Sequence, residues 1–167
     1  MSELAVHIRA EVPADREAIE HLHERAFGPG RFARTAFRLR ERAPELPALS
    51  FTAVVGTLLV GNVRVSPLSI GPEPALALGP LAVEPAFEKR GIGAALMARA
   101  LEAARSGGHT LMLLVGDEPY YGRFGFVRAS AGKLQMPGPV DPARLLLAEL
   151  APGAIERASG KVVGSRE

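Results

Sequence analysis

The stretch LAVEPAFEKRGIGAALMARAL, residues 81–101, passes from an apolar run through a charged loop into a helix that opens on two glycines. The apolar run begins earlier, as ALALGPLAV over residues 75–83, and predicts a strand buried on both faces. Beyond the loop, AALMARALEAAR over 94–105 has apolar positions at helical spacing, and TLMLLVG within 109–116 predicts another buried strand. Strand, helix and strand in this order form a βαβ unit, so we expect the two strands to be parallel.

Shorter patterns on either side of this unit predict the rest of the sheet and its helices. Before the unit we expect a strand over 6–10, a helix capped by Asp15 and stopped by GPG at 28–30, and a second helix over 32–42. A hairpin over 50–70 around Gly56 and a turn over 71–74 follow. After the unit we expect a short helix through Tyr120 and Tyr121, a strand over 125–129 and a final strand over 144–150. These additional strands are expected to be mostly antiparallel. The predicted fold class is therefore α/β (α+β), a mixed and mostly antiparallel sheet with flanking helices.

The composition is that of a globular protein with one core. The chain has 167 residues, of which 47% are hydrophobic and 23% are charged. We therefore expect one domain over residues 1–167, and we exclude a disordered chain and a collagen-like fibre. The chain has no cysteine, which excludes a disulfide framework, a thiolate metal site and a cysteine nucleophile.

The N-terminal sequence and the net charge bear on location and partners. MSELAVHIRAEVPADRE carries charges throughout and lacks the apolar run of a signal peptide. No apolar stretch reaches the ~20 residues that a membrane span needs. We therefore expect a cytoplasmic protein that does not act at a membrane. A formal net charge of +2 does not favour nucleic acid as the partner.

The glycine pair in KRGIGAAL predicts an anion site at the start of a helix. Gly91 and Gly93 let the backbone approach a ligand, and the first helical turn offers free N–H groups. Lys89 and Arg90 add positive charge at the same place. A nucleotide P-loop is excluded because no GxxxxGK[ST] string exists, and a dinucleotide GxGxxG/A is excluded because Leu96 takes its last position. On these residues alone, an ordinary tight turn between strand and helix explains the pattern equally well.

Taken together, LAVEPAFEKRGIGAALMARAL and the later LLVGDEPYYGRFGFVRA resemble the GCN5-related N-acetyltransferase (GNAT) superfamily, in particular its small bacterial YhbS-like members. In that family the acyl-CoA loop reads R/Q-x-x-G-x-G/A, and a later Y-x-x-x-G-F follows the point where the sheet splits. Residues 88–93 and 121–126 fill these two patterns in order, with Glu88 in place of the first Arg or Gln. The resemblance covers residues 4–150, and its specific motifs lie within 76–128.

The resemblance implies a GNAT fold, in which the central parallel strands splay into a V that holds acetyl-CoA. Gly79 and Pro80 lie inside the predicted buried strand, where they favour the bulge that opens the V. The family binds the cofactor with two segments, which here are Leu81, Ala82 and Val83 on the strand and Glu88, Lys89, Arg90, Gly91, Ile92, Gly93 and Ala94 in the loop. The departure at Glu88 leaves open whether the affinity for CoA is reduced.

The resemblance also implies direct transfer of an acetyl group to an amine. The general acid that protonates the leaving thiolate corresponds to Tyr121, with its neighbour Tyr120 as the alternative. A backbone N–H of the splayed strand would stabilise the tetrahedral intermediate. The general base is not evident from the sequence, and the nearest carboxylates are those of Glu84, Glu73 and Asp117.

Two features near the N-terminus are open to more than one interpretation. His21 and His23 point to different faces of the first helix, so we expect no metal site there. The segment from Arg31 to Arg42 is rich in arginine, and in the family the first helices wall the acceptor site. If Arg34 and Arg38 face the cleft, they favour an acceptor that carries a carboxylate or phosphate; the alternative is a solvated helix face.

The predicted function is therefore an acetyl-CoA-dependent N-acetyltransferase that acts on a primary amine of a small molecule or a protein. One alternative is a catalytically weak acyl-CoA-binding sensor or regulatory module on the same fold. Another is an enzyme that uses a different acyl donor. A homodimer is possible, because many relatives dimerise, although the sequence has no decisive interface signature.

Overall fold

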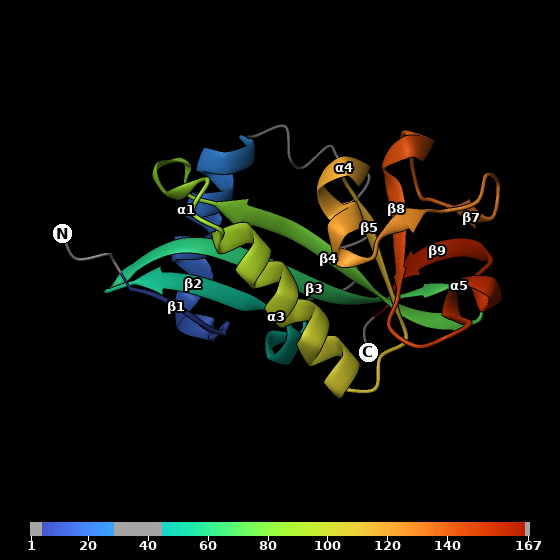
Figure 1. The fold of residues 1–167 in the computed structure, drawn as a ribbon, viewed down its shortest axis with the longest axis horizontal. Helices are drawn as coiled ribbons and strands as arrows, with labels where there is room; N and C mark the ends of the chain where they lie inside the picture. The colour runs from blue at the N-terminus through green and yellow to red at the C-terminus, as the bar shows by residue number, and fades with distance from the viewer. Residues whose placement is uncertain (1–4, 29–44, 166–167) are drawn as a thin grey trace.

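A computed structural model of the chain describes residues 5–28 and 45–165 (Figure 1). The strands are β1 (Val6–Ala10), β2 (Phe51–Val55), β3 (Leu58–Ile70), β4 (Glu73–Val83), β5 (Leu111–Val115), β6 (Val127–Arg128), β7 (Leu134–Gln135), β8 (Leu145–Glu149) and β9 (Gly160–Gly164). The α-helices are α1 (Arg16–Phe27), α3 (Ile92–Ser106), α4 (Glu118–Tyr121) and α5 (Ala154–Arg157), and the 3-10 turns are η1 (Pro13–Asp15), η3 (Pro47–Leu49), η4 (Pro85–Phe87), η5 (Gly122–Phe124) and η6 (Pro142–Arg144). The predicted helix over 32–42 lies outside the described residues.

The strands form one mixed sheet in the order β1-β2-β3-β4-β5-β8-β6, and β9 pairs with both β3 and β7. Neighbours in the main order are antiparallel except for β4 and β5, which are parallel as the βαβ pattern predicts. The β7 and β9 strands form a second parallel pair at the edge. The predicted fold class, a mostly antiparallel mixed sheet with a central parallel pair, is confirmed.

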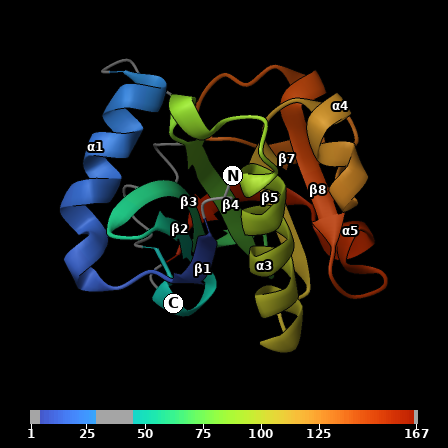
Figure 2. The same ribbon diagram turned by 60° about the vertical axis from the view of Figure 1, so that its left-hand side comes forward.

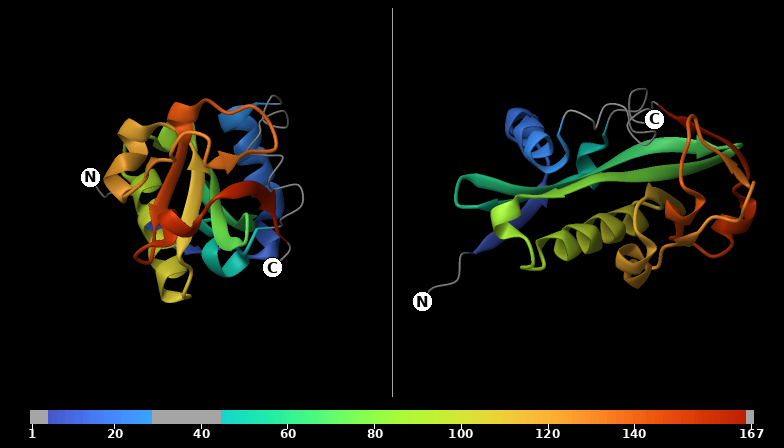
Figure 3. Two further views of the ribbon diagram at one scale, coloured as in Figure 1. Left: turned by 90° about the vertical axis from the view of Figure 1, so that its right-hand side faces the viewer. Right: turned by 90° about the horizontal axis from the view of Figure 1, so that it is seen from above.

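Helices cover both faces of the sheet. Figure 2 and the right-hand view of Figure 3 show α1 on one side of the strands and α3 on the other. The larger core lies under α3, where Leu96 and Met97 are fully buried against strand residues such as Val63. A smaller cluster, with Ile19 and Leu22 at its centre, holds α1 on the opposite face. Each such side chain contributes roughly 1.5–3 kcal/mol by leaving water, so burial fixes both helices on the sheet.

The β4 strand carries the predicted bulge. Val65 of β3 pairs with Leu78, and Val63 pairs with Leu81, so two residues of β4 oppose a single residue of β3. These two residues are Gly79 and Pro80, as the sequence predicts. Gly79 has φ +137°, a backbone conformation that side-chain-bearing residues rarely adopt. The bulge therefore depends on glycine at this position.

Beyond the bulge, β4 and β5 diverge. Their parallel pairing joins Leu76 to Met112 and Ala77 to Leu113. In the part of the chain that the structure describes, no later residue of β4 pairs with β5, although β4 continues to Val83. We call residues 73–78 the closed half of β4 and residues 79–83 its open half. The predicted V-shaped splay is thus confirmed.

Other sequence expectations need correction. The turn before β4 is shorter than predicted, because the strand begins at Glu73 and Pro74. The strand over 144–150 is not the last, since β9 follows it and pairs with Leu68–Ile70 of β3. Short strands of this kind lack a pattern of their own, and β9 is held by a partner that is far away in the sequence.

The Asp15 side chain differs from the expected helix cap. Asp15 stands at the N-cap position of α1, but its carboxylate accepts no hydrogen bond from the helix. It accepts instead from the Arg9 guanidinium, at 2.7 and 2.8 Å, and from the Val12 amide at 2.9 Å. The hydrogen bonds from Arg9 lower the pKa of Asp15 even though partial burial acts to raise it.

None of the helices in the described ranges is long and apolar enough to cross a membrane.

Candidate active site

The start of α3 forms a backbone anion site beside the open half of β4. Gly91 is the N-cap with φ +78°, and the Ala95 amide bonds to its carbonyl at 3.0 Å. The preceding amides of the first turn, including those of Ile92 and Gly93, have no carbonyl within the helix to bond to. A helix of 15 residues adds the positive end of its dipole at this point. The geometry therefore suits a bound phosphate group.

The predicted loop residues surround this helix start. Glu88, Lys89, Arg90 and Gly91 are all exposed, and Lys89 is a non-glycine residue with φ +63°. The Arg90 guanidinium lies 5.2 Å from the centre of the Phe87 ring. Two cationic side chains thus stand where the first turn of α3 opens to solvent, together with the one carboxylate of Glu88.

The strand residues that the sequence analysis assigned to the cofactor lie next to the same helix start. A Cβ atom placed on Gly93 would lie 3.8 Å from Cγ2 of Val83 and 4.0 Å from Cδ2 of Leu81. It would also lie 3.0 Å from the Tyr120 hydroxyl. Ala82, between the two strand residues, packs instead in the small cluster under α1. The open half of β4, the start of α3 and helix α4 therefore meet around Gly93.

The Tyr121 ring lies at the end of β5, on the other arm of the splay. Its edge packs against Gly116, where any Cβ atom would overlap the ring. The centre of the Phe126 ring is 6.2 Å away, and that of Tyr120 is 4.8 Å away. Burial raises the pKa of Tyr121 to about 12, and nearby Tyr120 and Asp117 add to the shift. The phenol is therefore protonated at neutral pH and able to donate a proton. The need for glycine at position 116 was missed in the sequence.

Each carboxylate considered as a general base is engaged by an arginine. Glu84 pairs with Arg25 at 2.7 Å, and Asp117 pairs with Arg144 at 3.3 Å. Glu73 lies at the far end of the closed half of β4, 3.7 Å from the nearest guanidinium nitrogen of Arg157. The structure thus separates Glu73 from the start of α3, while Glu84 follows the open half directly.

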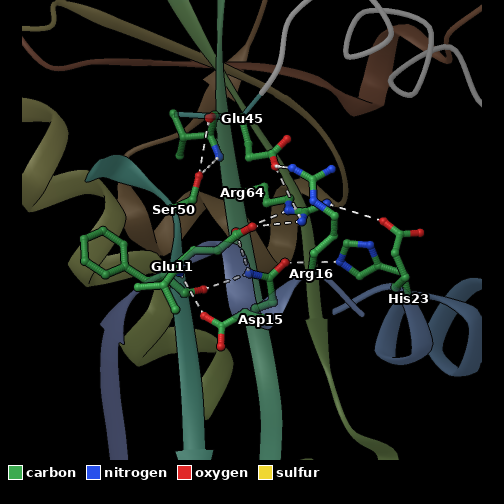
Figure 4. Close-up of polar contacts among 12 residues, drawn as sticks. Glu11, Asp15, Arg16, His23, Glu45, Ser50 and Arg64 are labelled. Carbon is green, nitrogen blue, oxygen red and sulfur yellow. Dashed lines mark hydrogen bonds and ion pairs between the residues drawn. The ribbon is translucent and has the colours of Figure 1, made fainter. Parts of the chain in front are cut away.

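A buried polar network on the α1 face of the sheet was not identified from the sequence (Figure 4). Arg64, which opposes the bulge, donates to Glu11 at 2.8 and 3.2 Å. Burial acts to lower the pKa of Arg64, but the hydrogen bonds and the charge of Glu11 outweigh it, and the pKa is raised. Glu20 and Glu45 lie at 3.7 Å from the same guanidinium.

The network extends through Asn62 to α1. Asn62 Nδ2 donates to the Phe51 carbonyl at 3.0 Å and to Glu11 at 3.3 Å. Its Oδ1 atom therefore faces His23 Nε2, 3.2 Å away, and this nitrogen must be the donor. His23 is buried while His21 is exposed, so the two histidines point to different faces as predicted. The i, i+2 spacing of Asn62 and Arg64 on one strand is the sequence signal for this network.

Within residues 5–28 and 45–165, no three histidine or carboxylate side chains are grouped so that they could hold a metal ion.

Comparison with known proteins agrees with this geometry. The sequence profile of the acetyltransferase (GNAT) family matches residues 16–126. The uncharacterized N-acetyltransferase YhbS of Escherichia coli strain K12 is 28% identical over 157 residues, which is 93% of each chain.

Two solved structures are also similar. The crystal structure of YhbS from Escherichia coli in complex with CoA has a TM-score of 0.82 and 25% identity, covering 99% of this chain and 92% of that chain. A GNAT family acetyltransferase from Brucella melitensis in complex with acetyl-CoA has a TM-score of 0.72 and 28% identity, covering 96% of both chains. The profile match spans most of the chain and includes the bulge, the loop and both tyrosines, and it shows that this protein belongs to the acetyltransferase (GNAT) family of acyltransferases.

Proposed function

We propose that this chain transfers an acetyl group from acetyl-CoA directly to a primary amine. The observation that carries the proposal is the divergence of β4 and β5 after Ala77 and Leu113, next to the free amides at the start of α3. A thioester with a long amide-containing arm and a pyrophosphate fits such a site, because the strand offers backbone partners to the arm and the helix offers them to the phosphates. Two similar proteins are known with CoA or acetyl-CoA bound.

In this proposal the amides of the first turn of α3 hold the pyrophosphate, and Lys89 and Arg90 add positive charge. The pantetheine arm lies along the open half of β4, with Leu81 and Val83 as its side-chain neighbours. The exposed carboxylate of Glu88 opposes the phosphates, but solvent screens an exposed charge. We therefore expect Glu88 to weaken CoA binding only modestly.

The chemistry follows from the thioester. The neutral amine attacks the carbonyl carbon, a C–N bond forms, and the carbonyl oxygen gains negative charge that a backbone N–H near Leu81 stabilises. The intermediate then collapses, the C–S bond breaks, and the Tyr121 hydroxyl gives its proton to the sulfur. The nitrogen loses a proton to water or a base, so the products are an N-acetylated amine and free CoA.

The first experiment is isothermal titration with acetyl-CoA, repeated with ATP and with NAD. We expect micromolar binding of acetyl-CoA alone, followed by release of free thiol when an amine library is added. Absence of acetyl-CoA binding would contradict the proposal. The competing function, an acyl-CoA sensor, is favoured by the arginine partners of Glu84 and Asp117, and it predicts binding without thiol release for every amine tested.

We further propose that the chain acts as one domain in the cytoplasm, with a small-molecule or protein amine as acceptor. Arg34 and Arg38, which motivate an anionic acceptor, lie outside the described residues. A screen that pairs each amine with its carboxylate-bearing analogue tests this preference directly. Size-exclusion chromatography with light scattering tests whether the protein forms a homodimer.

A further inference from the structure

Arg123, on η5, holds its charge over two aromatic rings. Its Cζ atom lies 4.6 Å from the centre of the Tyr120 ring and 4.8 Å from that of Phe124. The two rings are themselves 5.8 Å apart. Cation–π contacts of this kind restrict a long side chain without neutralising it. The guanidinium is therefore positioned in advance and has all its donors on an exposed residue.

The charge of Arg123 is also uncompensated. Most arginines in the described ranges pair with a carboxylate, namely Arg9, Arg16, Arg25, Arg64, Arg128, Arg144 and Arg157. No carboxylate that the structure places lies within 4.0 Å of Arg123. Its neighbour along the chain, Arg128, donates to Glu118 at 2.8 Å. Arg123 is thus free to pair with an anion from outside the chain.

The position of Arg123 relative to the phosphate site follows from Tyr120. The Tyr120 hydroxyl would lie 3.0 Å from a Cβ atom placed on Gly93, while the Arg123 guanidinium lies over the Tyr120 ring. The Arg123 guanidinium therefore lies over the same ring whose hydroxyl group neighbours the start of α3. Lys89 and Arg90 belong to the loop on the β4 side. The start of α3 thus has cationic residues in the preceding loop and a further cation stacked on Tyr120.

We propose that Arg123 binds the 3′-phosphate of the cofactor and makes the site selective for acetyl-CoA over 3′-dephospho-acetyl-CoA. This inference rests on the proposed function. The free amides of one helical turn suffice for a pyrophosphate, but CoA carries a third phosphate on its ribose. This 3′-phosphate is a dianion away from the pyrophosphate and needs a cation of its own. A guanidinium can donate hydrogen bonds to two of its oxygens at once. Because Tyr120 and Phe124 hold Arg123 in place, little side-chain entropy is lost when it binds.

The test is a cycle of two ligands and two proteins. Isothermal titration gives Kd for acetyl-CoA and for 3′-dephospho-acetyl-CoA with the unchanged chain and with Arg123→Gln. We expect removal of the 3′-phosphate to weaken binding to the unchanged chain about 10-fold to 100-fold, the range of a charge-assisted hydrogen-bonded pair. Arg123→Gln should lose as much for acetyl-CoA and discriminate between the two ligands less than about 3-fold.

Arg128→Gln is the matched control, because it removes an equal charge a few residues away whose carboxylate partner is known. It should keep the full discrimination between the ligands. Thermal melting of each variant checks that the exposed substitution leaves the fold intact. Arg90→Gln, titrated with the same two ligands, tests whether the loop cation binds the 3′-phosphate in place of Arg123.

Several outcomes would overturn the inference. One is equal affinity of the unchanged chain for both ligands, and another is an Arg123→Gln variant that still discriminates between them. If Arg90→Gln no longer discriminates between the two ligands and Arg123→Gln still does, the 3′-phosphate is bound by Arg90 in the loop. Failure of the unchanged chain to bind acetyl-CoA at all is a different result, which contradicts the proposed function rather than the role of Arg123 alone.

Discussion

The two halves of β4 differ in how their backbone is used. In the closed half, Leu76 and Ala77 pair with β3 on one side and with β5 on the other. In the open half, Leu81 and Ala82 pair with β3 alone in the described structure. The bulge at Gly79 and Pro80 separates the two. One strand thus supplies a fully bonded interior on one side of the bulge and unpaired backbone groups on the other.

This difference in backbone pairing indicates that the closed half of β4 stabilises the fold and that the open half binds the cofactor. Ala77 and its partner Leu113 are almost completely buried, and residues 75–78 of the closed half are all buried. The open half has Leu81 and Val83 only partly buried, beside the exposed loop. We therefore expect substitutions in the open half to change cofactor binding and turnover, and those in the closed half to change the free energy of unfolding.

The largest expected effect comes from the helix start next to the open half. Gly91→Asp should abolish acetyl-CoA binding in isothermal titration, because a side chain at this N-cap position has open space around it and brings a negative charge to the proposed phosphate site. Gly56→Asp is its control, since Gly56 also has positive φ and nothing within 4 Å of an added Cβ. Both variants lose about 1 kcal/mol of backbone stability, but only Gly91→Asp should lose binding. Normal binding to Gly91→Asp would refute the phosphate site.

The next effect concerns proton transfer at the β5 arm. Tyr121→Phe should lower kcat by about 10² to 10⁴, because the sulfur loses its proton donor, with little change in the Kd for acetyl-CoA. Tyr120→Phe is the control and should keep most of the turnover. Thiol release measured under saturating acetyl-CoA compares the two. An unchanged rate in Tyr121→Phe, or a larger loss in Tyr120→Phe, would assign the acid to another residue.

A truncation in the closed half should act on stability alone. Leu113→Ala removes a side chain that is 1% exposed and pairs with Ala77, so we expect a loss of about 2–5 kcal/mol in the free energy of unfolding. Urea unfolding measures this loss. For the folded fraction, the Kd for acetyl-CoA should stay within about 3-fold of the original. A much larger change in affinity would show that the two halves are coupled.

The smallest expected effect is a loss of stability at high pH. The pKa of Tyr121 is raised from 10.0 to about 12. The contribution of this residue to the free energy of unfolding is therefore fully present below about pH 10 and is lost as the pH rises through about 12. In that window the unfolded chain releases the proton and the folded chain retains it. The maximum loss is about 2–3 kcal/mol. Urea unfolding at about pH 9 and about pH 11.5 should show a smaller decline for Tyr121→Phe than for Tyr120→Phe; equal declines would contradict the shift.

Local sequence patterns predict the central part of this fold well. The strand–loop–helix pattern of residues 75–105 and the Gly79–Pro80 pair depend on turn chemistry and periodicity, which neighbouring residues determine. For this reason the parallel pair, the bulge and the start of α3 were all predicted. The β9 strand was not, because its pairing with Leu68–Ile70 joins segments that are far apart along the chain.

Side-chain partners were harder to predict than elements. Asp15 was placed correctly at the start of α1, but its partner Arg9 comes from an adjacent strand and takes the carboxylate away from the helix. The ion pair of Arg64 with Glu11 likewise joins β3 to the end of β1. The pairing of Arg64 with Glu11 depends on how β1, β2 and β3 are arranged in the sheet, and periodicity along one strand does not contain that information.

We expect the backbone amides of β4 on the two sides of the bulge at Gly79 and Pro80 to exchange with deuterium at different rates. Amides of the closed half, bonded within the sheet, should exchange only when the sheet opens. Those of the open half that face away from β3 should exchange quickly, although they belong to the same strand and lie a few residues away. A ligand that occupies the splay should slow this second group alone, so a single peptide spanning residues 73–83 would report the arrival of the cofactor.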